Sequence, residues 1–291
     1  MKNVRTIICA VFLFSCVVFA FYLVKTHQLE DHTPPVITCD KDEITVSVSA
    51  DDTALLKGVT AEDDKDGDIT DSVRVSAMTH FIEKGKRTIT YIVFDQANQA
   101  GTAQRTVLYS DYESPKIYLS EPLRYSLSER SKANPAEYMT AEDCLDGDIT
   151  KQIRMSLGDD YYNSVAGDYD VTAQVTNSAG DVRVIPLQVT FVDNSNREES
   201  MKYYPVLSEY IVYTGVDEKV SLASYITGVK RGNGVYSFED DGEYLPFTKS
   251  AIDVEHEIDY AKPGTYPVEY SYTTEEGIKA VTRLYVVVEE K

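Results

Sequence analysis

An acidic phrase occurs twice in this sequence, and its carboxylates are the side chains best suited to chemistry. AEDDKDGDIT spans residues 61–70, and AEDCLDGDIT spans residues 141–150. Alternating carboxylates such as Asp64, Asp66 and Asp68 suit a hard cation, because Ca²⁺ prefers oxygen ligands. Carboxylates in pairs also serve acid–base catalysis. A third interpretation is that the phrase only turns the chain in a repeated domain.

The spacing of the first copy departs from that of an EF-hand calcium loop. Such a loop requires Gly at its sixth position and Glu at its twelfth, where this sequence has Ile69 and Val75. In the second copy Cys144 replaces Asp64, and a thiol is a poor calcium ligand. We therefore expect no cofactor and no metal site here. A looser calcium site between domains stays open, since hard cations accept carboxylates in many geometries.

Turn chemistry accounts for every residue type in the phrase. Each copy has an Asp-Gly dipeptide, in which glycine adopts positive φ and aspartate hydrogen-bonds nearby backbone. The aspartate that closes each AED triplet is expected to accept backbone N–H groups, and Ile69 and Ile149 are expected to begin a core-facing strand. The predicted structural-turn residues are Asp63, Asp66, Gly67, Asp68, Asp143, Asp146, Gly147 and Asp148.

Nothing in the sequence predicts an enzyme. The nucleophile motif GxSxG and the phosphate loop GxxxxGK[ST] are absent. The histidines at 27, 32, 80 and 256 are scattered, so they form neither a zinc spacing nor a base beside a nucleophile. The acidic phrase occurs in two domains, whereas an active site is normally built once. We expect a non-catalytic protein.

The phrase belongs to a longer repeat with a period of 80 residues. PPVI at 34–37 corresponds to SPKI at 114–117. Later segments alternate apolar and polar residues between two glycines, as in GDYDVTAQVTNSAG at 167–180. This period of two predicts antiparallel strands with one buried face. In VRVIPLQVTFV, Pro186 predicts an edge strand or a bulge, because proline lacks a backbone donor.

About seven short strands per repeat predict an all-β fold of three tandem immunoglobulin-like β-sandwich domains. The expected domains cover residues 33–110, 114–193 and 203–291, and the last is divergent. The link DNSNREESMK at 193–202 is polar and rich in turn formers, so we expect the third domain to be mobile.

Cys39 and Cys144 lie in different predicted domains, and we expect each to be a buried, inert thiol.

The N-terminus predicts one transmembrane helix, a signal-anchor. Residues 7–24 hold 18 apolar or nearly apolar residues without a charge, and roughly 17–25 residues span a bilayer. Lys2 and Arg5 precede them, so the positive-inside bias predicts a cytoplasmic stub at 1–6 and extracellular domains in a single-pass cell-membrane protein. A cleaved signal peptide, or a lipoprotein signal with lipidated Cys16, stays open. Both would also export the chain.

The charge balance excludes nucleic acid as a partner. The chain holds 28 Lys and Arg against 48 Asp and Glu, a net charge of −20. Such a chain is repelled by nucleic acid and by anionic lipid surfaces. We expect contact with the membrane only through residues 7–24.

Several motifs together carry a family resemblance. TPPVI, then TAEDDKDGDIT, then an alternating strand that ends in NQAG or NSAG resemble the bacterial immunoglobulin-like repeats of Gram-positive surface proteins. A similar module is appended to some pesticidal crystal toxins. The resemblance covers residues 33–193 and weakens over 203–289, where YITGVKRGNG replaces any DGDIT. It implies modules that connect or present other domains.

Two functions stay open. The first is a cell-surface protein whose tandem modules present a membrane-distal domain for adhesion or protein–protein assembly. The alternative is a carbohydrate- or cell-wall-binding protein that stacks sugar rings on tyrosines, as in DDYYN at 159–163 or KYYP at 202–205. The expected partner is therefore a surface protein or a glycan.

Overall fold

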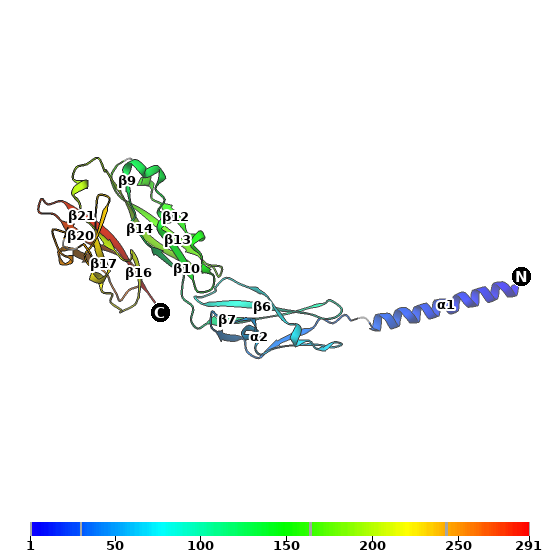
Figure 1. Cartoon of the computed structure of the whole chain (residues 1–291). Coiled ribbons are helices and arrows are strands. Elements are labelled where there is room, and N and C mark those ends of the chain that lie inside the picture. The colour runs from blue at the N-terminus through cyan, green and yellow to red at the C-terminus, as the bar shows by residue number, and fades with distance from the viewer. Residues whose placement is uncertain (1, 30, 163–164, 242–243, 291) are drawn as a thin grey trace. The chain divides into compact units, whose positions relative to one another are not determined.

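The chain forms two compact units. The computed structural model describes residues 2–29, 31–162, 165–241 and 244–290. The first unit is Met1–Tyr112 and the second is Glu113–Lys291. In Figure 1 the first unit is coloured from blue to cyan, and the second from green to red.

Helix α1 (Lys2–Leu29) contains the apolar N-terminal segment. Its span Ile7–Thr26 is long and apolar enough to cross a membrane, and none of that span is buried against protein. Among the described residues, no other helix meets this test. The predicted apolar helix is therefore present.

Sandwich 1 denotes strands β1 to β7, which form a three-stranded and a four-stranded sheet. The strand orders are β1-β3-β4 and β2-β7-β6-β5, and β2 pairs in parallel with β7. The alternating side chains Ile89, Tyr91 and Val93 of β6 are at most 1% exposed in its core. The elements are β1 (Val36–Cys39), β2 (Glu43–Val46), α2 (Asp52–Leu56), β3 (Val59–Asp63), β4 (Gly67–Asp68), β5 (Arg74–Met78), β6 (Lys86–Phe94) and β7 (Ala100–Tyr109).

Sandwich 2 denotes strands β8 to β14 and repeats this topology. Its sheets have the orders β11-β10-β8 and β12-β13-β14-β9, and β9 pairs in parallel with β14. The strands are β8 (Lys116–Leu119), β9 (Arg124–Ser126), β10 (Met139–Asp143), β11 (Gly147–Asp148), β12 (Arg154–Leu157), β13 (Gly167–Thr176) and β14 (Val182–Val192).

Sandwich 3 denotes strands β15 to β21, and it has the same topology although it lacks the acidic phrase. Its sheets have the orders β15-β17-β18 and β16-β21-β20-β19, again with a parallel pair, β16 and β21. The predicted all-β fold of immunoglobulin-like sandwiches is confirmed. The strands are β15 (Tyr204–Leu207), β16 (Ile211–Gly215), β17 (Ile226–Arg231), β18 (Gly234–Ser237), β19 (Asp253–His256), β20 (Gly264–Thr273) and β21 (Lys279–Glu289).

Short 3₁₀ helices follow the acidic phrases, and they correct one prediction. Ile69 and Ile149 do not begin a strand; each immediately precedes a 3₁₀ turn, because the next backbone N–H bonds back to an aspartate. Ile149 is nevertheless buried in the core. The 3₁₀ helices are η1 (Thr70–Ser72), η2 (Leu127–Lys132), η3 (Pro135–Tyr138), η4 (Thr150–Gln152), η5 (Asp159–Tyr162), η6 (Glu199–Met201), η7 (Leu222–Tyr225) and η9 (Lys249–Ala251).

Sandwiches 2 and 3 pack against each other, so the expectation of a mobile third domain is wrong. One continuous cluster of buried apolar side chains runs through both sandwiches. The Tyr213 hydroxyl accepts a hydrogen bond from Ile117 N at 2.7 Å and donates one to Ile117 O at 2.9 Å. Arg283 forms an ion pair with Asp168 at 2.8 Å. The polar link gave no sign of this, because complementary groups on the domain surfaces hold the pair.

Pro186 lies at a locally unpaired edge, as its sequence predicts. Strand β9 pairs with β14 only from Thr190 to Val192. Further back along β14, Gln188 N donates instead to the Tyr285 hydroxyl of sandwich 3 at 2.8 Å. Because backbone direction alternates along a strand, Pro186 N faces this same side, where no strand requires a donor.

Candidate functional site

The two acidic phrases fold into nearly the same turn. Asp63 Oδ1 accepts hydrogen bonds from the backbone N–H groups of Lys65 and Asp66, both at 2.9 Å. In the second copy, Asp143 Oδ1 accepts from Leu145 N at 2.9 Å and Asp146 N at 3.1 Å. These bonds let the chain reverse between β3 and β4, and between β10 and β11.

The middle aspartate of each phrase ties the turn to a neighbouring hairpin. Asp66 Oδ2 accepts from Gln96 N at 2.7 Å, after β6. Asp146 accepts from both Ser178 N and Ser178 Oγ at 2.6 Å, after β13. These bonds hold each turn to the four-stranded sheet of its own sandwich.

The glycines and the last aspartates complete both turns. Gly67 and Gly147 have φ of 71° and 69°, which glycine adopts without strain. Asp68 and Asp148 accept from the N–H two residues later, each at 2.9 Å. Hydrogen bonding from the Thr70 and Thr150 side chains, and then from their backbones, lowers the pKa of these two aspartates. The structure thus places Asp66 and Asp146 between the strands, and the other six predicted turn residues at the adjoining ends of β3, β4, β10 and β11.

The copies differ at the group that faces the second oxygen of the buried aspartate. In sandwich 2, Asn177 Nδ2 donates to Asp143 Oδ2 at 3.0 Å. In sandwich 1 the corresponding position, which opens the same four-residue turn, holds Asp95. Asp63 is 8% exposed, and its Oδ2 has no hydrogen-bond partner among the described residues.

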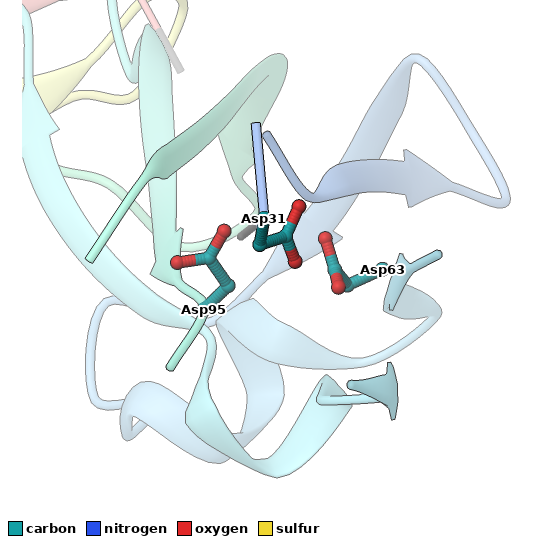
Figure 2. A group of neighbouring side chains, drawn as sticks. All are labelled: Asp31, Asp63 and Asp95. Atoms are coloured by element: carbon teal, nitrogen blue, oxygen red, sulfur yellow. The ribbon is translucent and has the colours of Figure 1, made fainter. Parts of the chain in front are cut away.

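A third carboxylate joins this pair from the segment that follows α1. Asp31, Asp63 and Asp95 each offer a carboxylate oxygen, and these oxygens lie within 4.8 Å of one another. Figure 2 shows the three side chains converging. Sequence reasoning did not single out Asp31 or Asp95. The available signal was Asp95 in DQANQAG, where the second repeat has Asn177 in NSAG.

The alternating carboxylates that first suggested calcium do not form this group. Of Asp64, Asp66 and Asp68, none is a member, and Asp64 is exposed. Cys144, which replaces Asp64 in the second copy, is also exposed and donates to Glu113 O at 3.1 Å. Cys39 is half-buried. The expectation of buried thiols is wrong, since the Asp64 position lies on the outer side of the turn.

A groove of 620 Å³ lies at the junction of sandwiches 2 and 3. Its lining includes Arg124, Tyr125, Tyr138 and Tyr204. The Arg124 guanidinium lies 3.4 Å from the centre of the Tyr204 ring and donates to Val281 O at 3.0 Å. Burial raises the pKa of the hydroxyls of Tyr125 and Tyr204, and of the described side chains none donates to or accepts from Tyr125 Oη.

One tyrosine of each run that suggested sugar stacking is poorly placed for it, and the side chain of Tyr162 lies outside the described part of the chain. Tyr161 of DDYYN is 4% exposed, and Tyr204 of KYYP is 9% exposed. Asn163, which ends DDYYN, lies outside the described residues. A buried ring offers no open face to a sugar, so any glycan contact would have to use other tyrosines.

Solved structures with a similar arrangement include the CBM51-2 and INT domains of ZmpB from Clostridium perfringens, in complex with GlcNAc, at 19% identity and a TM-score of 0.22. That match covers 52% of this chain and 26% of the other, so this chain spans about a quarter of its length. The lipoprotein BT2262 of Bacteroides thetaiotaomicron matches at 12% identity over 86% of this chain and 98% of its own, with a TM-score of 0.19. Human CDH23 EC21-23 matches at 12% identity over 88% and 100%, with a TM-score of 0.21.

No curated protein matches the chain. Residues 40–108 match the family model of the Ig-like domain of bacterial surface proteins. That segment holds most of sandwich 1, including its acidic turn. The resemblance to bacterial immunoglobulin-like repeats is thus confirmed, and sandwich 1 is a bacterial surface Ig-like domain.

Proposed function

We propose that this chain is a non-catalytic, single-pass protein of the cell membrane that presents Ig-like sandwiches outside the cell for adhesion or protein–protein assembly. The observation that carries the proposal is an unburied apolar helix, Ile7–Thr26, followed by a bacterial surface Ig-like domain. Lys2 and Arg5 lie before the helix, which favours a cytoplasmic N-terminus. The net charge of −20 keeps the exported part soluble and away from anionic lipid.

The repeated turns support a presenting role over a catalytic one. Their carboxylates are engaged by backbone N–H groups in both sandwiches. A catalytic acid or base needs a free lone pair or proton at the substrate. We infer that most carboxylates of the phrase serve to hold the turn.

The pair formed by sandwiches 2 and 3 is the natural unit for partner recognition. Its two sandwiches share one buried apolar cluster, so they move together. A rigid pair presents a fixed surface and loses little conformational freedom when a partner binds. We propose that the partner, a surface protein, binds this pair and not sandwich 3 alone.

Cys144 offers a test of the topology. It is exposed in sandwich 2, whereas Cys9 and Cys16 lie in α1. A membrane-impermeant maleimide applied to intact, wall-digested cells should label the wild type and not the Cys144→Ser variant. Cys39→Ser serves as the matched control and should keep its label. Labelling of Cys144 only after lysis would contradict an extracellular location.

The junction groove favours a second candidate function, binding of a glycan. Tyr125 and Tyr138 line it. Aromatic faces and hydroxyls of this kind recognise sugar rings. A glycan array probed with the full chain and with Tyr138→Ala should show a hit that the variant loses. Equal binding by both proteins would remove the groove from consideration.

A further inference from the structure

Three carboxylates converge in sandwich 1, and the hydrogen bonds that the structure gives them come from neutral groups. Asp31 accepts from Thr33 N at 3.0 Å, and Asp63 Oδ1 accepts from two backbone N–H groups at 2.9 Å. Asp95 accepts from the backbone of Gln99 at 2.7 Å and from its side-chain amide at 3.1 Å. Lys65 is the nearby cation that contributes to lowering the pKa of Asp31, after the backbone of Thr33. Neutral donors and this one cation do not offset three formal negative charges.

The second oxygen of Asp63, Oδ2, is buried without a hydrogen-bond donor in the described part of the chain. The side chain is 8% exposed, and no described residue donates to Oδ2. Asp95 beside it is also 8% exposed. A buried carboxylate oxygen without a donor is costly, and a second buried carboxylate next to it adds repulsion. A cation at this point would remove both costs.

Sandwich 2 provides an internal control for this conclusion. There the same oxygen, Asp143 Oδ2, receives a hydrogen bond from Asn177 Nδ2 at 3.0 Å. The turn that holds Asp143 matches that of Asp63 bond for bond. The Asn177 amide thus satisfies the second oxygen of Asp143 without an ion. In sandwich 1 the Asp95 carboxylate takes the place of that amide, and the second oxygen of Asp63 has no donor among the described residues.

We propose that Asp31, Asp63 and Asp95 bind one Ca²⁺ ion. All three ligands are hard oxygens, which excludes the soft-metal chemistry of thiolate and imidazole sites. Oxygens within 4.8 Å of one another lie close enough to share one ion, and small side-chain shifts bring them to the Ca²⁺–oxygen distance of about 2.3–2.6 Å. Mg²⁺ requires about 2.0–2.1 Å and near-octahedral geometry, so its ligand oxygens must lie closer together than those of Ca²⁺. Water completes the six to eight ligands that Ca²⁺ takes.

The ion would fix the chain where it leaves the helix. Helix α1 ends at Leu29, and Asp31 follows it by two residues. Asp63 closes β3 and Asp95 follows β6, so both belong to the body of sandwich 1. Calcium therefore joins the segment after α1 to the first sandwich. That this segment lies at the outer membrane surface rests on the proposed function, but the binding of the ion does not.

Calorimetric titration of CaCl₂ into the chelator-treated full chain in detergent tests the site. We expect one ion per chain, with a Kd of about 10⁻⁴–10⁻³ M, which is usual for extracellular modules. Asp95→Asn should weaken binding at least about tenfold, because it removes a ligand and supplies the amide of the second copy. Asp64→Asn is the matched control in the same turn, and it should bind as the wild type does.

Thermal unfolding separates loss of the ion from loss of the fold. Saturating calcium should raise the melting temperature of the wild type by about 5 °C and leave that of Asp95→Asn unchanged. Without calcium, Asp95→Asn should melt at or above the wild-type temperature. The proposal is overturned if the wild type binds no calcium, if Asp95→Asn binds equally well, or if Mg²⁺ binds more tightly. These outcomes do not depend on the labelling of Cys144, so failure of the site and failure of the topology are distinct.

Discussion

Sandwiches 1 and 2 contain the same acidic turn but stabilise it in different ways. In the second, the Asn177 amide donates to the buried oxygen of Asp143. In the first, Asp95 faces Asp63, and the carboxylate of Asp31 approaches the same point. The backbone bonds of the turn are alike in both. One side chain, an amide or an acid, decides whether the turn is self-sufficient or requires a cation.

The sandwiches also differ in what satisfies their outer backbone. Sandwich 3 covers open positions of sandwich 2: the Tyr285 hydroxyl accepts from Gln188 N in β14, and the Tyr213 hydroxyl bonds Ile117 in β8. Unpaired strand edges invite association with other chains, so this cover also protects sandwich 2. Sandwich 2 thus relies on a neighbouring domain to satisfy part of its outer backbone.

The largest expected effect comes from separating sandwich 2 from sandwich 3. Arg124 stacks on Tyr204 and donates to Val281 O and to Thr282 Oγ1. Arg124→Ala should reduce the free energy of unfolding of the second unit by about 3 kcal/mol, because stacking and charge-assisted hydrogen bonds are lost together. Urea denaturation followed by circular dichroism measures this.

The control for Arg124 is an exposed arginine of the same sandwich. Arg154 is exposed on β12, and its replacement by Ala should change the free energy of unfolding by about 0.5 kcal/mol or less. If Arg124→Ala behaves like Arg154→Ala, the junction does not depend on this arginine, and the shared apolar cluster alone holds the two sandwiches.

The next largest effect is expected from a substitution that gives the turn of sandwich 2 the carboxylate found in sandwich 1. Asn177→Asp places a carboxylate against Asp143 Oδ2, where the amide now donates. We expect a loss of about 2 kcal/mol in the free energy of unfolding, from the lost hydrogen bond and the new like charge. Asn177→Ser, which keeps a donor at that position, is the milder control. If Asn177→Asp left the free energy of unfolding unchanged, the group opposite the buried aspartate would not contribute to stability.

Much of the fold followed from sequence pattern, because strand alternation and turn dipeptides are local signals. The alternation in GDYDVTAQVTNSAG predicted a strand with one buried face, and Val171, Ala173 and Val175 of β13 are buried. The carboxylate cluster could not be predicted from the sequence pattern, since Asp31, Asp63 and Asp95 come from three separate segments and meet only through the fold. The junction was also hidden, because Tyr213 and Tyr285 look like any strand tyrosines until the edges that they cap are in place.

A smaller effect tests whether the two turns really share one backbone. Gly67 and Gly147 have positive φ, and a Cβ built on either would meet no atom within 4 Å. Replacement by Ala should therefore cost only the backbone strain, about 1 kcal/mol, and the same amount at each site. Thermal denaturation of each single variant checks this. Unequal costs would mean that the surroundings of the turns differ more than their hydrogen bonds do.

The smallest effect is the response of the turns to acid. Hydrogen bonds from Thr70 and Thr150 lower the pKa of Asp68 and Asp148 in the folded chain. A lowered pKa adds stability above the ordinary aspartate value of about 3.9, and this stability is lost as the pH falls through the lowered pKa. The double variant Asp68→Asn, Asp148→Asn should therefore show a shallower loss of melting temperature below about pH 4. Asp64→Asn is the exposed control, and an equally shallow slope there would assign the effect to net charge. Equal slopes for the single variants Asp68→Asn and Asp148→Asn would show that the two turns respond alike to acid at this position. The difference between the turns would then be confined to the group that faces the buried aspartate, Asn177 in one and Asp95 in the other.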